Sequence, residues 1–307
     1  MVDHQRLYEV KSATRANFGA LWLANFEANK GKIGRHAPVT SLFEKFENIP
    51  AIAVGAGPSL DKNIRRLEAL NGKAIIISVD TNLNKLERAG ISPHFVMSLD
   101  PQPDIARFFY GVDTSKKILV APTIAHPNTI DAWKGEIIFY NKFAPDIPQL
   151  TQVAKQNPET GYLIPGGSVL TVGLDLAFRM GANPIGFAGQ DLSYPPDGPA
   201  YSSDTLYGDQ NYEELFSQQL KEMIEDTDIF GRTVPTKKSM FITKQWMEWA
   251  FTTWKRKNRA DYYNLTEGGI VIKNCEIMTM AEWATRFCCE TRNIGWAIKK
   301  VLRKKRR

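Results

Sequence analysis

The sequence predicts an α/β protein with a Rossmann-like, mostly parallel sheet flanked by helices, an N-terminal helix and a mainly helical C-terminal region. Between residues 50 and 190, short apolar runs alternate with helical segments, which is the pattern of βαβ units. The runs are apolar throughout, as expected for parallel strands buried on both faces. Most are followed by Gly, Asp or Pro. Polar motifs therefore fall at the carboxyl ends of the strands, where open α/β sheets bind ligands.

Composition and the first residues set broad limits. The chain has 307 residues, of which 43% are hydrophobic and 23% charged, so one large domain or two smaller ones can form. No apolar stretch is long enough to span a bilayer, and the first residues lack a signal-peptide core. We therefore expect a cytoplasmic protein with no transmembrane segment. Its expected parts are an N-terminal helical segment (1–46), a Rossmann-like nucleotide-binding domain (47–200) and a mainly helical C-terminal region with a basic tail (201–307).

The first predicted element is a helix over Gln5–Asn29, where apolar residues approximate a helical stripe and Gly31 is a plausible stop. The predicted strands are Ala51–Val54, Ala74–Val79, Phe95–Leu99, Ile118–Ala121, Ile137–Tyr140 and Ile185–Ala188. Helices are expected between several of them, over Asp61–Leu70, Asn82–Ala89 and Ser168–Met180.

The remaining third of the chain starts with a segment rich in Pro, Gly, Ser and Asp, over Tyr194–Asn211. It is expected to be an ordered loop or a mobile lid. Two helices should follow, over Tyr212–Glu225 and Lys238–Lys257. A short strand over Tyr262–Leu265 and one final helix within residues 280–296 complete the prediction.

The net charge of +6 comes from one segment. Residues 299–307 carry seven positive charges, so the rest of the chain has a net charge of 6 − 7 = −1. A basic body that would bind nucleic acid is therefore not predicted. The tail is either a solvated helix end or a contact for an anionic lipid surface or an acidic partner.

The cysteines and histidines predict no metal site. Cys275, Cys288 and Cys289 have neither a disulfide framework nor metal-ligand spacing, so they are expected to be reduced thiols. His126 follows the fourth strand of the predicted domain. It is the best-placed histidine for a substrate contact, and a structural role stays open.

A glycine turn follows the first predicted strand. Gly55 and Gly57 are expected to allow positive φ angles and the close approach of a ligand to the backbone. Pro58 and Ser59 lead into a helix whose N-terminus would suit a phosphate. Ser59 could cap that helix or donate to a phosphate oxygen. The turn is neither a full dinucleotide fingerprint nor a Walker A loop.

Acidic and amide residues follow the next two strands. Asp80 and Asn82 end the second strand, and Asp100 ends the third. The two acids could bind a ribose hydroxyl, hold a divalent metal or take a proton from an acceptor. Capping of the following helix is an equal alternative for Asp80. The prolines after Asp100 favour a functional loop position instead.

A second glycine-rich turn precedes the predicted helix 168–180. Gly167 and Ser168 form another possible anion or hydroxyl site at a helix N-terminus. Gln190 and Asp191 follow the strand after that helix and should face the same edge of the sheet. Ordinary turn chemistry is the alternative for both residues.

Several motifs together resemble the Rossmann-like core of the motility accessory factor family of flagellin glycosyltransferases. They are Gly55–Leu60, Asp80-Thr81, Ser98–Gln102, Gly167-Ser168 and Gly189–Leu192. Asn264–Gly269 resembles a segment of that family downstream of the core. The core is also similar to bacterial sialyltransferases, and the same domain family includes archaeal 6-hydroxymethylpterin pyrophosphokinases.

The resemblance implies transfer of a nonulosonic, sialic-acid-like sugar from a CMP-activated donor to a hydroxyl of flagellin or of a glycan. No tightly bound cofactor is expected beyond the CMP-sugar. The nucleotide would contact Gly55, Gly57, Pro58, Ser59, Asp80, Asn82, Gly167, Ser168 and Gln190. Asp100 or Asp191 would act near the acceptor hydroxyl. Thr266 and Glu267 would contact the substrate together with His126.

Two alternatives remain open. A pyrophosphokinase would use Asp80 and Asp100 to hold Mg²⁺ and the phosphates of ATP, with a pterin alcohol as nucleophile. A non-catalytic nucleotide-binding protein is the other possibility. It is suggested by the loop Ala200–Asp204, which lacks the histidine that relatives often carry after the Gln-Asp motif.

Overall fold

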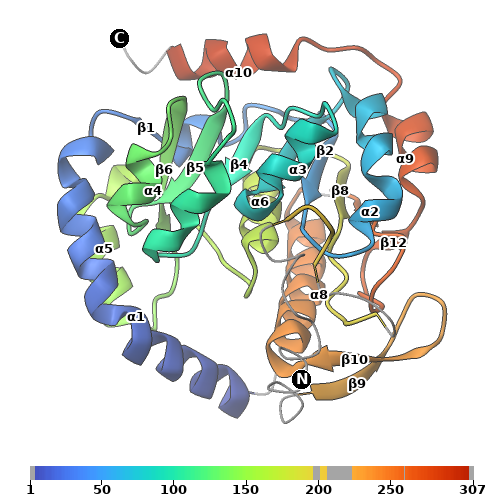
Figure 1. The fold of residues 1–307 in the computed structure, drawn as a ribbon, viewed down its shortest axis with the longest axis horizontal. Helices are drawn as coiled ribbons and strands as arrows, with labels where there is room; N and C mark the ends of the chain where they lie inside the picture. Colours follow the sequence, from blue (N-terminus) through green and yellow to red (C-terminus); the bar gives the residue numbers. More distant parts are fainter. Residues whose placement is uncertain (1–3, 196–200, 206–222, 259, 304–307) are drawn as a thin grey trace.

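The computed structural model describes residues 4–195, 201–205, 223–258 and 260–303. Within them, ten strands form a sheet in the order β1-β6-β5-β4-β3-β2-β8-β11-β12, with β7 also paired to β6 (Figure 1). Every pair in this sheet is parallel. The strands are β1 Ala37–Pro38, β2 Ala51–Val54, β3 Ile75–Val79, β4 Phe95–Met97, β5 Ile118–Pro122, β6 Glu136–Lys142, β7 Tyr162–Leu163, β8 Ile185–Ala188, β11 Tyr262–Asn264 and β12 Glu276–Ile277.

The order of the strands places a topological switch point between β2 and β8. From β2 to β6 the chain adds strands in one direction, and it then returns to place β8 on the other side of β2. The connections that follow β2 and β8 therefore leave the sheet in opposite directions. This opens a crevice at their carboxyl ends, which is the usual ligand position in such sheets.

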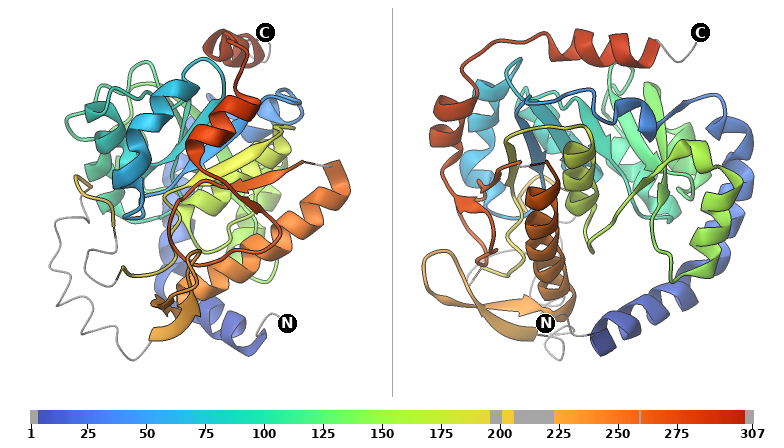
Figure 2. Two further views of the ribbon diagram at one scale, coloured as in Figure 1. Left: turned by 90° about the vertical axis from the view of Figure 1, so that its right-hand side faces the viewer. Right: turned by 180° about the vertical axis from the view of Figure 1, so that it is seen from behind.

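The sheet is buried on both faces. Alternate residues of β2 belong to different apolar clusters, with Ala51 and Ala53 in one and Ile52 and Val54 in another. Helices α6 and α8 cover the first face and lie side by side (Figure 2). The other face is covered by α1, α4 and α5 over β4–β6, and by η2, α3 and α9 over β2 and β3. The predicted fold class is thus confirmed.

The helices agree in part with the sequence prediction. Their bounds are α1 His4–Ile33, α2 Leu60–Asn63, α3 Leu83–Arg88, α4 Pro127–Asp131, α5 Pro148–Gln156, α6 Val169–Arg179, α8 Lys238–Asn258, α9 Met280–Phe287 and α10 Ile294–Arg303. Shorter 3₁₀ segments are η1 Val39–Leu42, η2 Ile64–Leu70, η3 Asp80–Asn82, η4 Pro103–Phe109 and η5 Pro158–Thr160. The helix expected over Asp61–Leu70 is therefore a single α-helical turn followed by 3₁₀ structure. None of the described helices combines the length and the apolar character needed to cross a bilayer.

The final helix was predicted as one element, and this is wrong. The chain leaves helical geometry at Cys288, and α10 begins only at Ile294. The backbone N–H of Arg292 donates to the carbonyl of Gly72, which ties the linker to the end of η2. The residues between α9 and α10 bond to another element, and the chain therefore forms two separate helices here.

The region after residue 200 is less helical than predicted. Residues 223–225 of the helix expected over Tyr212–Glu225 belong to β9 Met223–Thr227, which pairs with β10 Thr233–Lys237 as an antiparallel hairpin. Residues 212–222, and the lid residues 196–200 and 206–211, lie outside the described part. Strand β11 pairs with β8 and so adds residues of this region to the central sheet.

Candidate functional site

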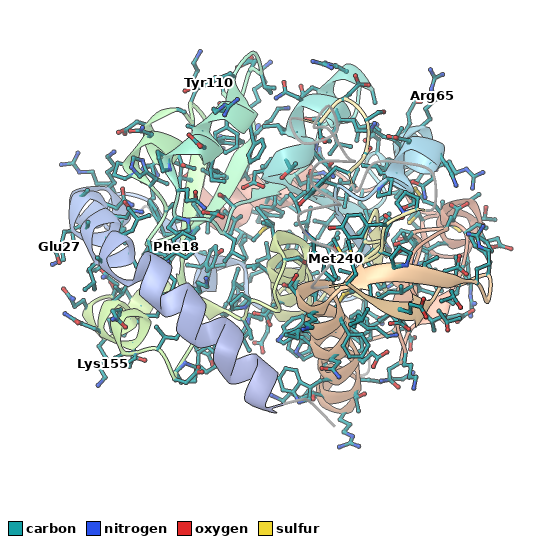
Figure 3. All side chains as sticks on the ribbon, turned by 60° about the horizontal axis from the view of Figure 1, so that its bottom comes forward. Phe18, Glu27, Arg65, Tyr110, Lys155 and Met240 are labelled. Atoms are coloured by element: carbon teal, nitrogen blue, oxygen red, sulfur yellow. The ribbon has the colours of Figure 1, made fainter. Side chains whose placement is uncertain are left out.

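A cleft of about 530 Å³ lies at the carboxyl ends of β2, β3, β4, β6 and β8. Phe18 on α1 and Met240 on α8, both labelled in Figure 3, also line it. Eight residues singled out from the sequence meet there: Gly55, Gly57, Asp80, Asp100, Gly167, Ser168, Gln190 and Asp191. The position of these polar residues at the carboxyl ends of the strands therefore predicted where the cleft lies.

The glycine turn after β2 is needed for packing against the turn after β8. A Cβ on Gly57 would lie 1.9 Å from Asp191 Oδ2 and 2.7 Å from the carbonyl oxygen of Gly189. A Cβ on Gly55 would lie 2.5 Å from the same carbonyl oxygen. Neither glycine has a positive φ, so that part of the prediction is wrong. The group that approaches this turn closely is therefore the turn after β8, where a ligand was predicted.

Asp191 occupies the phosphate position predicted at the start of α2. Its Oδ1 accepts the backbone N–H of Ser59 at 3.2 Å, and its Oδ2 accepts the Ser59 hydroxyl at 2.9 Å. Burial raises the pKa of Asp191 to about 6, and the two bonds from Ser59 oppose that rise. The donors of this turn are thus engaged by an internal carboxyl group.

The N-terminus of α6 is the more open anion site. Gly167, Ser168 and the first two helical residues, Val169 and Leu170, line the cleft. Within the described part of the chain, no hydrogen bond engages the backbone N–H groups of Val169 or Leu170. Gln190 Nε2 lies 3.4 Å from Ser168 Oγ and holds that hydroxyl at the helix end. N–H groups without a partner and the helix dipole together favour a negatively charged group there.

Two carboxyl groups line the cleft wall made by the ends of β3 and β4. Asp80 is buried, and its Oδ1 accepts from the backbone N–H and the hydroxyl of Thr81. Asp80 Oδ2 has no partner at bonding distance, although the nearby Ser98 hydroxyl lowers the pKa. Burial dominates and raises the pKa of Asp80 to about 6, with a further rise from the charge of Asp100. Asp100 is half-buried and accepts the backbone N–H of Gln102.

Two lysines of the cleft were not found from the sequence. Lys142 ends β6, and its ammonium group lies 5.2 Å from the centre of the Trp22 ring. Burial lowers the pKa of Lys142 to about 8, and the charge of Asp100 opposes that effect. Lys237 ends β10 and lies over the Tyr194 ring. The position of Lys142 at a strand end was a usable signal, whereas that of Lys237 depends on an unpredicted hairpin.

Five predicted site residues lie behind the cleft wall. Asn82 donates to the carbonyl of Gly55, and Gln190 N–H meets the Thr266 hydroxyl at 3.4 Å. Glu267 pairs with Arg66 at 3.0 Å and accepts the backbone N–H of Met280 at 3.2 Å. The other two behind the wall are Pro58 and Ser59, both in the turn that Asp191 engages. These residues support the residues that line the cleft.

His126 lies outside this cluster. It is the N-cap residue of α4, and its Nδ1 accepts the backbone N–H of Asn128 at 3.1 Å. It does not appear among the residues that line the cleft. The geometry therefore gives it a helix-capping role.

The described residues hold no group of three or more His, Cys, Asp or Glu side chains arranged for a metal ion. Magnesium often uses only one or two carboxylates and completes its coordination with water and nucleotide phosphates. Asp80 and Asp100 could supply two such ligands if a nucleotide were bound.

The substitution Asp80→Asn is expected to stabilise the protein at pH 7.5 by about 2 kcal/mol. The folded state binds protons more tightly than the unfolded state at Asp80 and Asp191, because burial raises both pKa values to about 6. Their contribution therefore makes the native protein gain stability as the pH falls from about 7 towards 4, and the variant should gain less. Urea denaturation between pH 4.5 and 7.5 measures both effects.

An acidic residue with the opposite shift is the control for this prediction. Bonds from Ser115 lower the pKa of the exposed Asp113 carboxyl group. The contribution of Asp113 should disappear as the pH falls, so Asp113→Asn should not reduce the gain in stability. An Asp80→Asn variant with the unaltered slope of the native protein would contradict the assignment of Asp80.

Comparison with known proteins finds a matching family and similar proteins. The family model described as "6-hydroxymethylpterin diphosphokinase MptE-like" matches residues 24–197. An uncharacterized protein of Treponema pallidum (strain Nichols) is 33% identical over 94 residues, covering 29% of this chain and 42% of that protein. The structure of a MAf glycosyltransferase from Magnetospirillum magneticum AMB-1 is similar with a TM-score of 0.61 and 20% identity. That similarity covers 88% of this chain and 40% of the other, so the matched part is less than half of either relative.

Proposed function

The chain belongs to the 6-hydroxymethylpterin diphosphokinase MptE-like family, and we propose from its cleft and from its similarity to a MAf glycosyltransferase that it binds a nucleotide-activated sugar and is a glycosyltransferase. The donor in this proposal is a CMP-activated nonulosonic sugar, and the acceptor is a hydroxyl of flagellin or of a glycan. The observation that carries the proposal is the meeting of the α6 N-terminus, Lys142 and Asp100 in one cleft. The α6 N-terminus and Lys142 could stabilise an anionic leaving group, and Asp100 could accept the proton that the acceptor hydroxyl loses.

The part of the chain beyond the family match also supports a transferase. The family model ends at residue 197, yet Lys237, Ser239, Met240 and Thr243 line the cleft. The segment 266–270 lies behind the cleft wall, where the Ile270 N–H donates to the carbonyl of Asp191. The similarity to the MAf glycosyltransferase covers 88% of the chain and so extends over part of this region.

The proposed reaction exchanges one bond for another at the anomeric carbon of the sugar. The bond from that carbon to the phosphate oxygen breaks, and CMP leaves with the electron pair. The acceptor oxygen forms the new bond, and its proton passes to a base. We assign Asp100 as that base, because both oxygens of Asp191 already accept hydrogen bonds from Ser59. The α6 N-terminus and Lys142 would stabilise the departing phosphate.

A diphosphotransferase is the second candidate, and one observation favours it. Asp80 and Asp100 line the same wall, and the charge of Asp100 acts on Asp80. The pair could hold Mg²⁺ while the hydroxyl of a pterin attacks the β-phosphorus of ATP and AMP leaves. A non-catalytic nucleotide-binding protein would show ligand binding without turnover of either donor.

Melting of the purified protein with CMP, CDP, UDP, GDP or ATP, each with and without Mg²⁺, distinguishes these candidates. A ligand at a hundred times its dissociation constant adds about 2.7 kcal/mol to the free energy of unfolding. We expect stabilisation by CMP in the presence and absence of Mg²⁺. Stabilisation by Mg·ATP alone would exclude the glycosyltransferase and support the diphosphotransferase.

Two lysine variants locate the effect. Lys142→Met keeps an apolar stem against Trp22 and removes the charge, so the CMP-dependent shift should fall strongly. Lys134→Met removes an exposed lysine that does not line the cleft and should leave the shift unaltered. Equal CMP shifts in the two variants would mean that the nucleotide binds elsewhere.

A further inference from the structure

Helix α10 has one buried and one charged face. Its residues Ile294, Ile298 and Leu302 are buried in the main apolar cluster. The outward face carries an aromatic residue and three cations: Trp296, Lys299, Lys300 and Arg303. Trp296 is 58% exposed, and the ammonium group of Lys300 lies 4.8 Å from the centre of its ring. A large aromatic side chain thus stands in solvent among positive charges.

This helix lies at the amino ends of the strands, on the side of the sheet opposite the cleft. It borders a depression of about 360 Å³ together with Ile118 at the start of β5 and Glu136 at the start of β6. Those positions are the amino ends of the strands, whereas the cleft lies at the carboxyl ends. Figure 1 shows α10 along the top of the molecule, away from the starts of α1 and α8.

The net positive charge of the sequence comes from its last nine residues. Residues 299–307 carry seven positive charges, and the remainder of the chain has a net charge of 6 − 7 = −1. Of these cations, Lys299, Lys300 and Arg303 lie on α10, and residues 304–307 lie outside the described part. Lys116 borders the same depression as Lys299 and Arg303, and it adds another cation to the edge. Among the described residues that line it, Glu136 is the one acidic residue.

We infer that the α10 face docks on an anionic lipid bilayer. Trp296 would enter the headgroup layer, where amphipathic tryptophan rings are favoured. The cations would meet the negative surface potential of acidic lipids. Docking in this orientation would leave the cleft facing away from the bilayer and open to a large acceptor.

The chemistry of the face favours a lipid surface over an acidic protein. Ile294, Ile298 and Leu302 are already buried against the main apolar cluster, so this stripe of α10 is not free to pack on a partner helix. What remains is one aromatic ring surrounded by long, flexible cations. This composition suits a fluid layer of phosphates, to which lysine side chains adapt without a fixed geometry.

Co-sedimentation of the full chain with vesicles tests the inference. We expect binding to phosphatidylcholine vesicles that contain phosphatidylglycerol, little binding to pure phosphatidylcholine, and a loss of binding as salt increases. The double variant Lys299→Glu and Lys300→Glu should weaken binding by roughly a hundredfold or more. Trp296→Ala should weaken it several-fold.

A matched control makes the same charge change on other elements. Arg65 on η2 and Lys155 on α5 are exposed, and both are labelled in Figure 3. The double variant Arg65→Glu and Lys155→Glu should keep nearly all of the binding. Melting curves of all variants confirm that they are folded.

Two results would overturn the inference. One is the absence of binding to the anionic vesicles at low salt. The other is an equal loss in the α10 variant and in the control, since net charge alone would then account for the attraction. Neither result depends on nucleotide binding, so the inference and the proposed function fail separately.

Discussion

The substitution Gly57→Ala is expected to destabilise the fold by about 3 kcal/mol or more and to abolish nucleotide binding. The added Cβ would lie 2.7 Å from the Gly189 carbonyl oxygen and 1.9 Å from Asp191 Oδ2. The carbonyl belongs to a backbone that accepts the Gly57 N–H at 2.7 Å, so it cannot move without breaking that bond. Displacing the carboxyl group would remove the partner of Ser59. Urea denaturation and the CMP-dependent melting shift measure the two effects.

Gly31→Ala is the matched control for this substitution. Gly31 lies in α1, and nothing lies within 4 Å of the position of its Cβ. Alanine is the better helix former, so this variant should be as stable as the native protein or more stable by up to about 1 kcal/mol. A Gly57→Ala protein with native stability would contradict the packing reason given for this glycine.

The substitution Asp100→Asn is expected to lower the rate of sugar transfer by roughly 10²- to 10⁴-fold, since a positioned general base contributes about that much. The KM for the donor should alter less, because the proposed donor contacts are at α6 and Lys142. The fold should be retained, since an asparagine oxygen can still accept the Gln102 N–H. The measurement is release of CMP and transfer of sugar to a hydroxyl acceptor.

Asp104→Asn is the control for the base. Asp104 lies in η4, is exposed and does not line the cleft, so its loss should leave the rate unaltered. An Asp100→Asn variant as active as the Asp104→Asn variant would remove Asp100 from the catalytic role. No transfer by the native protein would instead count against the proposed function itself.

The fold class and the position of the cleft followed from local signals in the sequence. Continuous apolar runs specify parallel strands buried on both faces, and the residues after these strands share one edge. Membership of the domain family with the MptE-like proteins was also recognisable from the motifs after β2, β3, β4 and β8, and residues 24–197 match that family.

What the sequence did not show depends on contacts between distant segments. Whether Ser59 binds Asp191 or an external phosphate depends on how the turns after β2 and β8 pack. Ser59 and Asp191 are 132 residues apart in the sequence. The break before α10 depends on a hydrogen bond from Arg292 to Gly72. Lys237 reaches the cleft only because β9 and β10 form a hairpin. Periodicity carries no information about such contacts.

The pairing of β8 with β11 has a consequence for biosynthesis. Strand β8 is an interior strand of the sheet, but one of its two neighbours, β11, is formed by residues 262–264. A chain leaving the ribosome exposes the N–H and C=O groups along that side of β8 until those residues emerge. During this interval the nascent domain has an open, apolar sheet edge, which favours association with other chains. A chaperone that shields such edges during translation would therefore increase the yield of folded protein.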